Sequence, residues 1–392
     1  MAPFDQVGDD MDFTFTEEQT LLRSSLAAYL ADQYDFETRR RVVGAEPGWR
    51  PEVWKAFAQD LGILGALAPA EVGGSEGGPV EMMVIMEELG RALVAEPFLS
   101  TAVIAGGLLA RAGGPVAATL LPQIVGGDVR AAFAFSEPHA RYDWRDLTST
   151  ARKAGAGYVL DGRKAMVLGA PWASHLIVTA RTGGAQRDSG GISTFVLDAA
   201  ARGITRQDYA TIDGGRASDV TFENVSVPAE ALIGAEGEAA PLLERIIDEA
   251  TVGLCAEAVG LMRAMHEQTV DYTKQRKQFG QPLGAFQVLR HRMVDMFIQL
   301  EQATSITYLA AIRLADEDPI ARARAASAAK AQVGQAARFV GQQAIQLHGG
   351  MGLTDELAVG SYFKRATVIE TQFGDTDHHL ARYSNLSFGA AA

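Results

Sequence analysis

The hydrophobic period changes twice along this chain, and that change constrains the fold more than any other feature. Between residues 130 and 227, apolar residues alternate or form short β-rich runs, as at 192–197 and 220–227, and Asp-Gly or Gly-Gly pairs separate them. A period of two is typical of strands, whereas the flanking stretches show the spacing of amphipathic helices. The sequence therefore predicts an α+β fold in which a β block lies between two helical blocks.

These blocks set the expected domain boundaries. We expect an N-terminal all-α domain at residues 1–128, a middle β-barrel domain at 129–236 and a C-terminal four-helix bundle at 237–392. Thr16 and Gln19 form a capping box, and Pro51 begins a further helix. The glycine-rich loop at 73–78 follows no strand and precedes no Gly-Lys-Ser/Thr, so it is interpreted as a connector.

Composition excludes several classes of function. The net charge of −13 argues against nucleic acid or anionic membranes as partners. No apolar run reaches membrane-spanning length, and residues 1–12 are polar and acidic, unlike a signal peptide. The single cysteine, Cys255, lies in an apolar helical segment, which favours a core position and a cytoplasmic setting.

Residues 271–287 are predicted to form a helical hairpin. One helical pattern, at 239–278, is ended by Gly280 and Pro282, and a second begins near residue 285. Arg276 lies close to Phe279 across the last turn, and Gln287 opens the returning helix. An Arg fork beside an aromatic edge can hold a pyrophosphate and an adjoining ring system. The alternative is an ordinary corner of a helical bundle.

A second motif, Gln346-Leu-His-Gly-Gly-Met-Gly352, ends another helix with a glycine cluster. Together with Tyr272-Thr-x-x-Arg276-x-x-Phe279-Gly280-x-Pro282-Leu283-x-x-Phe286-Gln287, it strongly resembles the signature of the flavin-dependent acyl-CoA dehydrogenase family. The resemblance covers nearly the whole chain. The sequence is most similar to the small subunit of pimeloyl-CoA dehydrogenases in four segments, at residues 32–37, 256–260, 341–346 and 373–379.

The resemblance implies FAD as cofactor, an acyl-CoA substrate and an electron-transferring flavoprotein or similar acceptor. In the family, a base removes a proton from Cα of the thioester while a hydride passes from Cβ to the flavin. The neighbouring subunit holds the adenine half of each FAD, which implies a homo- or hetero-oligomer, either a dimer or a tetramer. The implied cofactor contacts are Arg276, Phe279, Phe286, Gln287, Gln346, Gly349, Gly350, Thr376, Ser136 and Leu168.

The β-domain part of the resemblance is incomplete. The family's Thr-Glu-Pro-x-x-Gly-Ser-Asp loop is represented by residues 135–143, which keep Ser136-Glu137-Pro138 and lose the Gly-Ser pair. The family's Trp-Ile-Thr is Met166-Val167-Leu168, and Leu168 carries no hydroxyl group for the flavin.

The family's catalytic base is also missing from its usual places, because an ungapped count puts the two known positions on Gly374 and Ala250. Asp248, Glu249 and Glu370 lie nearby and are the candidate bases if the helices are rotated or offset. The alternative is that all three are solvated or paired. His378 and His379 point about 100° apart on a helix, so we predict no metal site and interpret them as structural or cofactor-edge residues.

Three functional hypotheses follow. The first is a subunit, the small one, of a heteromeric acyl-CoA dehydrogenase acting on a dicarboxyl or otherwise bulky acyl-CoA. The second is a self-sufficient homo-oligomer, and the third is a homologue that binds acyl-CoA without redox chemistry. A distal carboxylate would meet one of the basic residues in or beside the altered loops, which are Arg141, Arg145, Arg152, Lys153 and Arg163.

Overall fold

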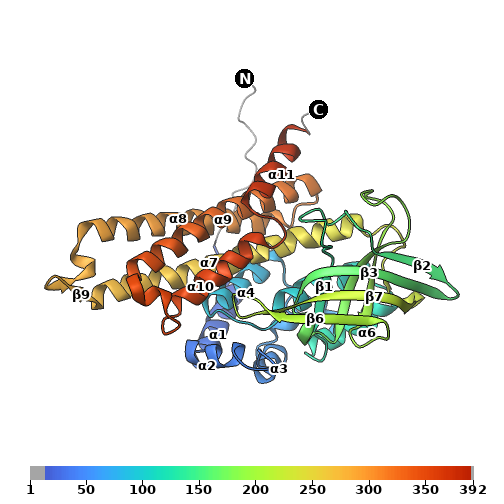
Figure 1. The fold of residues 1–392 in the computed structure, drawn as a ribbon, viewed down its shortest axis with the longest axis horizontal. Helices are drawn as coiled ribbons and strands as arrows, with labels where there is room; N and C mark the ends of the chain where they lie inside the picture. The colour runs from blue at the N-terminus through green and yellow to red at the C-terminus, as the bar shows by residue number, and fades with distance from the viewer. Residues whose placement is uncertain (1–13, 390–392) are drawn as a thin grey trace.

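The computed structural model describes residues 14–389, and the acidic segment 1–12 lies outside them. The described chain has a helical N-terminal part, a middle sheet and a C-terminal set of long helices (Figure 1). This order confirms the predicted α+β class. No helix in the described part is long and apolar enough to cross a membrane.

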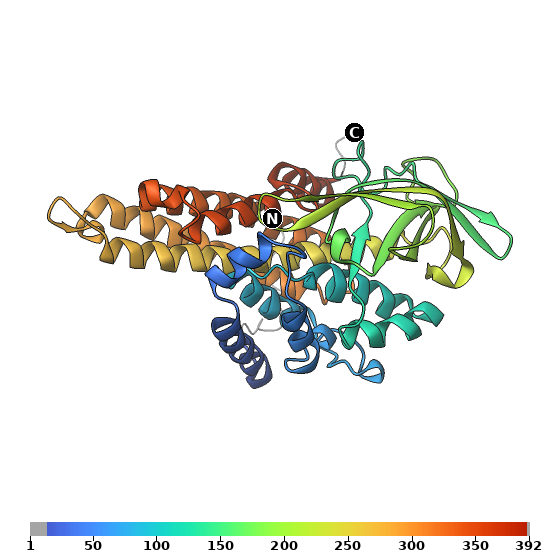
Figure 2. The same ribbon diagram turned by 60° about the horizontal axis from the view of Figure 1, so that its bottom comes forward.

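The N-terminal part packs along one side of the long helices (Figure 2). The predicted capping box is present: Thr16 Oγ1 accepts from Gln19 N at 3.1 Å, and Gln19 Oε1 accepts from Thr16 N at 3.0 Å. A short helix capped by Asp35 was not anticipated. The α-helices are α1 (Glu17–Gln33), α2 (Phe36–Val43), α3 (Pro51–Gln59), α4 (Pro79–Arg91), α5 (Gly106–Ala112) and α6 (Gly114–Val125), and a π-helical segment, Leu99–Ala105, precedes α5.

The middle part is one curved sheet with the strand order β6-β7-β3-β2-β4-β5-β8, and β1 pairs with β4 in parallel. Among the described residues the end strands β6 and β8 are not paired with each other, so the hydrogen-bonded path stays open. The strands are β1 (Ala131–Ala134), β2 (Thr150–Ala154), β3 (Gly157–Leu168), β4 (His175–Arg181), β5 (Ile192–Asp198), β6 (Ile204–Ala210), β7 (Arg216–Pro228) and β8 (Leu232–Ile233).

The C-terminal part is a bundle whose longest helix, α7, runs from the sheet to the opposite end of the molecule (Figure 1). The predicted hairpin is present, but the first helix ends at Gln275 rather than Gln278. Phe279 and Gly280 both have positive φ and form a two-residue turn between the short strands β9 and β10, which takes these residues out of the helix. The elements are α7 (Ala240–Gln275), β9 (Lys277–Gln278), β10 (Gln281–Pro282), α8 (Gln287–Arg313), α9 (Pro319–His348), α10 (Val359–Thr371) and α11 (Thr376–Phe388).

Helices α4 and α7 cross at close range, and this contact joins the N-terminal part to the bundle. A Cβ atom on Gly90 would overlap the Glu257 carbonyl, and one on Gly260 would overlap the Glu87 carbonyl. Only glycine permits such an approach at both positions. The crossing belongs to one continuous apolar core that includes Met86, Val259 and Cys255.

Candidate functional site

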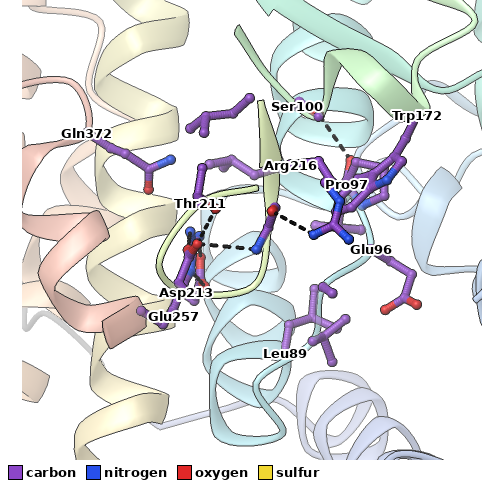
Figure 3. A pocket seen from close by; sticks show the side chains of 18 of the residues that line it. Leu89, Glu96, Pro97, Ser100, Trp172, Thr211, Asp213, Arg216, Glu257 and Gln372 are labelled. Atoms are coloured by element: carbon purple, nitrogen blue, oxygen red, sulfur yellow. Dashed lines mark hydrogen bonds and ion pairs between the residues drawn. The ribbon is translucent and has the colours of Figure 1, made fainter. Parts of the chain in front are cut away.

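Three adjoining cavities follow the seam between the sheet and the bundle. The inner chamber, of about 160 Å³, lies between the α4–α5 connection, the sheet and the end of α10 (Figure 3). The central chamber, of about 500 Å³, shares six lining residues with it, including Phe135, Leu168 and Phe373. The outer chamber, of about 730 Å³, adjoins the central one at Trp144 and Glu244.

The inner chamber has an apolar floor and one charged wall. Leu89, Phe98 and Trp172 contribute to the floor. On the wall, Arg365 donates to both carboxylate oxygens of Glu257 at 2.5 and 2.8 Å and to Asp213 at 3.0 Å. Burial alone would lower the pKa of Arg365, but the two carboxylates raise it, so this guanidinium stays charged and engaged.

A buried acid, Glu96, stands at the other side of the inner chamber (Figure 3). Its carboxyl accepts from the Tyr34 hydroxyl at 2.8 Å and from the Arg50 amide at 2.9 Å. Burial raises the pKa of Glu96 above its ordinary value. Both oxygens are therefore engaged by the N-terminal helices.

The central chamber contains two of the ten predicted cofactor residues. Ser136 and Leu168 line it, together with Tyr142 and Arg382. Thr376 does not: its hydroxyl donates to Glu370 at 2.9 Å below the chamber wall. The aromatic walls and the guanidinium and phenol groups suit a flat ring with polar edges, although Leu168 offers that ring no hydrogen bond.

Gly374, to which the ungapped count assigns the family's usual base, has no room for a side chain. Its φ is +119°, and a Cβ atom there would overlap the His378 ring and lie 2.8 Å from His379 Nε2. The buried ammonium of Lys330 holds this turn by donating to the carbonyls of Glu370, at 3.0 Å, and Gly374, at 2.5 Å. The turn is thus built around glycine.

Each of the three candidate bases is engaged elsewhere. Asp248 receives two hydrogen bonds from Arg382, at 2.5 and 3.2 Å, and burial raises its pKa despite this partner. Glu249 is bound by Arg111 at 2.6 Å and by Arg245 at 3.1 Å. Glu370 is paired with Arg338 at 3.1 Å and accepts from the Thr376 amide at 3.2 Å. None of the three lines the central chamber.

Below the chamber, the loop that carries Ser136 is fixed by a fully buried ion pair. Lys164 Nζ lies 2.8 Å from Glu137 Oε1, and both side chains are almost completely buried. Burial alone would raise the pKa of Glu137, but Lys164 and the neighbouring hydroxyl and amide donors lower it to about 2. The retained Ser-Glu-Pro sequence is therefore a structural anchor for this loop.

The other predicted cofactor residues gather at the far end of the bundle. Tyr272 at the end of α7 stacks on His348 at the end of α9, with ring centres 4.4 Å apart. This contact brings the hairpin and the glycine cluster together. Six residues there are exposed, namely Arg276, Phe279, Gln287, Gln346, Gly349 and Gly350; Phe286 is half-buried and meets the Phe279 ring edge-on at 6.2 Å.

The hairpin is organised to present its side chains outward. The turn holds Phe279 in the left-handed region at φ +53°, with 92% of the residue exposed. The Arg276 guanidinium makes no hydrogen bond or ion pair within the described residues 14–389, although its carbonyl accepts from Leu283 N at 2.8 Å. A free guanidinium beside an exposed phenyl ring fits a pyrophosphate with an adjoining base.

The two groups of predicted cofactor residues do not meet within one chain. Between Ile247, which lines the central chamber, and Gln275 before the hairpin, α7 rises by roughly 42 Å. Both views show the hairpin and the sheet at opposite ends of the molecule (Figures 1 and 2). One cofactor molecule reaches only one of the two ends.

Comparison with known proteins defines the class. Three family models match almost the full length: the acyl-CoA dehydrogenase N-terminal domain at residues 16–128, the middle domain at 132–225 and the C-terminal domain at 242–384. The chain belongs to the acyl-CoA dehydrogenase family, whose members bind FAD. Acyl-CoA dehydrogenase FadE12 of Mycobacterium tuberculosis is 32% identical over 91% of this chain and 92% of its own length.

Solved structures share the whole fold. A variant of the Tcur3481-Tcur3483 steroid ACAD is 29% identical, with a TM-score of 0.86 over 96% of this chain and 99% of its own. The ChsE4-ChsE5 complex of Mycobacterium tuberculosis is 27% identical, with a TM-score of 0.85 over 96% and 99%. The FAD complex of PigA, at 24% identity, has a TM-score of 0.87 over 96% and 98% and shares the fold.

Sequence reasoning did not find three residues that organise the site, namely Lys164, Lys330 and Arg382. Lys164 and Lys330 are almost completely buried and contact backbone or carboxylate groups far away in sequence. A lysine within an alternating or Ala-rich pattern gives no local signal of burial. Arg382 is recognisable only once α11 packs against α7.

Proposed function

We propose that this chain is the small subunit of a heteromeric acyl-CoA dehydrogenase and that it holds one end of an FAD whose chemistry occurs on a related partner. The observation that carries this proposal is the contrast between the two ends of the chain. The hairpin leaves Arg276 and Phe279 exposed. Within residues 14–389, by contrast, the central chamber has no unpaired carboxylate, because Glu244 is paired with Arg382 at 3.5 Å, and Gly374 has no room for a side chain.

The order of the three chambers supports acyl-CoA as the ligand. The inner chamber offers an apolar floor for an acyl chain, and the outer chamber is lined by Arg145, Arg245 and Arg322 as well as by four acidic residues, namely Glu238, Glu244, Asp248 and Glu317. Arg322 forms no ion pair in the described part of the chain: it donates to the backbone carbonyls of Asp316 and Glu317 at 2.7 and 2.8 Å, so no carboxylate neutralises its charge directly. Guanidinium groups suit the phosphates at one end of CoA, and the apolar floor suits the other end.

Within this assignment, each group of residues has a separate task. FAD, when bound, would supply the hydride acceptor. Arg276, Phe279, Gln287 and the glycines at 349 and 350 would bind its adenine half on behalf of a neighbouring subunit. Ser136 and Leu168 would form one wall of the central chamber beside the acyl group. Phe135, Phe373 and Trp144 would exclude water there.

A dicarboxyl or otherwise bulky acyl-CoA is the proposed substrate of the assembly, with an electron-transferring flavoprotein or similar acceptor as its oxidant. Of the basic residues considered for a distal carboxylate, Arg141 lines the central chamber and Arg145 the outer one. Arg152, Lys153 and Arg163 instead pair with acidic residues at 3.0, 2.6 and 2.9 Å on the exposed side of the sheet. Arg141 is therefore the better placed, because the acyl end of the ligand lies away from the outer chamber, which Arg145 lines and which is assigned to the CoA phosphates.

Purification with and without a co-expressed related subunit tests the proposal. The chain alone is expected to be colourless or weakly yellow and inactive, and the co-purified assembly is expected to bind FAD and oxidise acyl-CoA. Full FAD occupancy and turnover by the chain alone would instead establish the self-sufficient homo-oligomer, with Asp248, Glu249 or Glu370 as base. Acyl-CoA binding with no flavin in any assembly would support the non-redox homologue.

A further inference from the structure

Three phenyl rings form a stacked ladder at the boundary between the inner and central chambers. The ring centres of Phe133 and Phe135 are 4.7 Å apart with an interplanar angle of 16°. Those of Phe135 and Phe373 are 5.3 Å apart at 24°. Phe133 lines only the inner chamber, whereas Phe135 and Phe373 line both chambers. The Phe135–Phe373 pair therefore stands in the passage between them.

The backbone on the Phe135 side of this pair is held in place. The Phe135 carbonyl accepts from the buried Lys164 ammonium at 3.2 Å, and the Ser136 carbonyl accepts from Ala165 N at 2.9 Å. This loop cannot shift without disturbing the Lys164–Glu137 ion pair. Any movement of Phe135 is consequently a rotation of its half-buried side chain.

The backbone at Phe373 is also held in place by its surroundings. Phe373 has the positive φ of +55°, which is costly for an aromatic residue and persists only where the surroundings impose it. His379 Nε2 donates to its carbonyl at 3.1 Å, and Lys330 holds the carbonyls of Glu370 and Gly374. The turn thus aims the Phe373 ring at Phe135.

We infer that the Phe135–Phe373 pair is a partition that determines which acyl chains the protein accepts. This inference rests on the proposed function, in which acyl-CoA lies along the three chambers. A short acyl group ends in the central chamber with the rings stacked. A longer saturated chain enters the inner chamber only after Phe135 rotates away from Phe373.

The partition has a measurable signature in the dependence of affinity on chain length. Each buried methylene is expected to strengthen binding about fourfold. Separating a stacked aromatic pair weakens binding by about two- to tenfold per pair. The affinity should therefore rise with length, pause where the chain first reaches the rings, and rise again beyond them.

The experiment compares saturated acyl-CoA esters of increasing chain length by calorimetric titration of the assembly that contains the full chain. Phe135→Leu removes the ring while keeping an apolar side chain, and it is expected to abolish the pause and to strengthen binding of the long esters about two- to tenfold relative to the short ones. Phe339→Leu is the matched control, because Phe339 is half-buried on α9 and lines none of the three chambers. It should keep the pause.

Tryptophan fluorescence gives a readout that does not depend on the stability of the variants. Trp172 lines the inner chamber, whereas Trp144 lies at the boundary of the central and outer chambers. Acyl-CoA esters with a terminal bromine atom should quench Trp172 only when the chain exceeds the length at the pause, and Trp172→Phe identifies this signal. In Phe135→Leu, quenching should begin at a shorter chain.

The outcomes separate this inference from the proposed function. If all esters bind with a uniform increment per methylene in both wild type and Phe135→Leu, the partition does not exist but acyl-CoA binding stands. If a long brominated ester binds without ever quenching Trp172, the inner chamber does not receive the acyl chain and the inference fails. If no acyl-CoA binds, the proposed function falls and the inference with it.

Discussion

The sheet end and the hairpin end of this molecule differ in whether their functional charged side chains are paired or exposed. At the sheet end, Lys164 is paired with Glu137, Arg382 with Asp248, and Arg365 with Glu257 and Asp213. At the hairpin end, the Arg276 guanidinium is exposed and has no partner in residues 14–389, and Phe279 is 92% exposed. The first end is complete within one chain, whereas the second offers its groups to something outside the chain.

This difference separates residues that keep the structure from residues that are available to a ligand. A buried charge is stable only when it is paired, and breaking such a pair costs more than the pair contributes. An exposed Arg costs little to hold free because water solvates it. Substitutions at the sheet end should therefore change stability, while those at the hairpin end should change cofactor affinity.

The largest effect is expected at the buried pair below the central chamber. Lys164→Met should leave the Glu137 carboxylate buried without its cation and lower the free energy of unfolding by about 3–5 kcal/mol. Urea unfolding monitored by circular dichroism measures this loss. Arg313→Ala, which breaks the exposed Arg313–Asp316 pair, is the control and should change stability by about 1 kcal/mol or less. Equal effects would remove the distinction between the two kinds of pair.

The pH dependence of the stability of Glu137→Gln tests whether the buried Glu137 carboxylate is ionised in the folded protein. Because the folded-state pKa of Glu137 is about 2, below its ordinary value, its carboxylate stabilises the fold above about pH 4.5. This contribution, roughly 3 kcal/mol, is lost as the pH falls towards 2. The stability difference between wild type and Glu137→Gln should therefore be large at pH 7, fall by about half of this contribution at pH 3 and fall by most of it at pH 2. A constant difference across this range would show that the carboxylate is not held ionised.

At the hairpin end, Arg276→Ala should weaken FAD binding about ten- to a hundredfold, because it removes charge-assisted hydrogen bonds of about 1.5–3 kcal/mol. Arg276→Lys should recover only part, since an ammonium does not reproduce the planar fork. FAD titration of the apo assembly measures both, and excess FAD should restore most of any loss in melting temperature. If the affinity for FAD is unchanged, Arg276 has no role in FAD binding and the hairpin is an ordinary corner of the helical bundle.

A smaller effect is expected at Gly374. Gly374→Ala places a Cβ against His378 and His379 at φ +119°, so we expect a loss of stability of about 1–3 kcal/mol. Gly183→Ala is the matched control, because a Cβ there meets no atom within 4 Å. Thermal unfolding of the two variants makes the comparison. A fully stable Gly374→Ala would mean that the turn tolerates a side chain, and the position would again be open to a base.

The smallest effect is expected on catalysis from the three candidate bases. Asp248→Asn, Glu249→Gln and Glu370→Gln should each change the rate of flavin reduction by acyl-CoA in the assembled complex by less than about tenfold, or about 1.4 kcal/mol, because none of these carboxylates faces the central chamber. Rapid-mixing absorbance measurements follow this rate. A loss of several orders of magnitude at one position would identify the base and make this chain catalytic.

Local sequence predicted the architecture because secondary structure depends on short-range patterns. Local motifs revealed the capping box at Thr16 and the helix begun by Pro51, and the hydrophobic period revealed the change to strands near residue 131. The end of α7 was misplaced by three residues, because Lys277 and Gln278 fit a helix while the turn at Phe279 and Gly280 draws them into a hairpin. The helix α2 was missed, because its eight residues are too few to show a clear period.

The sequence by itself predicts the cofactor contacts at the hairpin end, since Arg276, Phe279 and the glycines at 349 and 350 belong to short motifs, and the structure shows these residues exposed. It also determined that no carboxylate stands at Gly374 or Ala250. Only the tertiary structure decided whether the neighbouring carboxylates are free or paired. Asp248 lies next to Arg382, and Glu249 next to Arg111, through contacts between residues more than a hundred positions apart. Whether a buried acid is free or paired depends on which elements pack against it, and sequence spacing does not encode that packing.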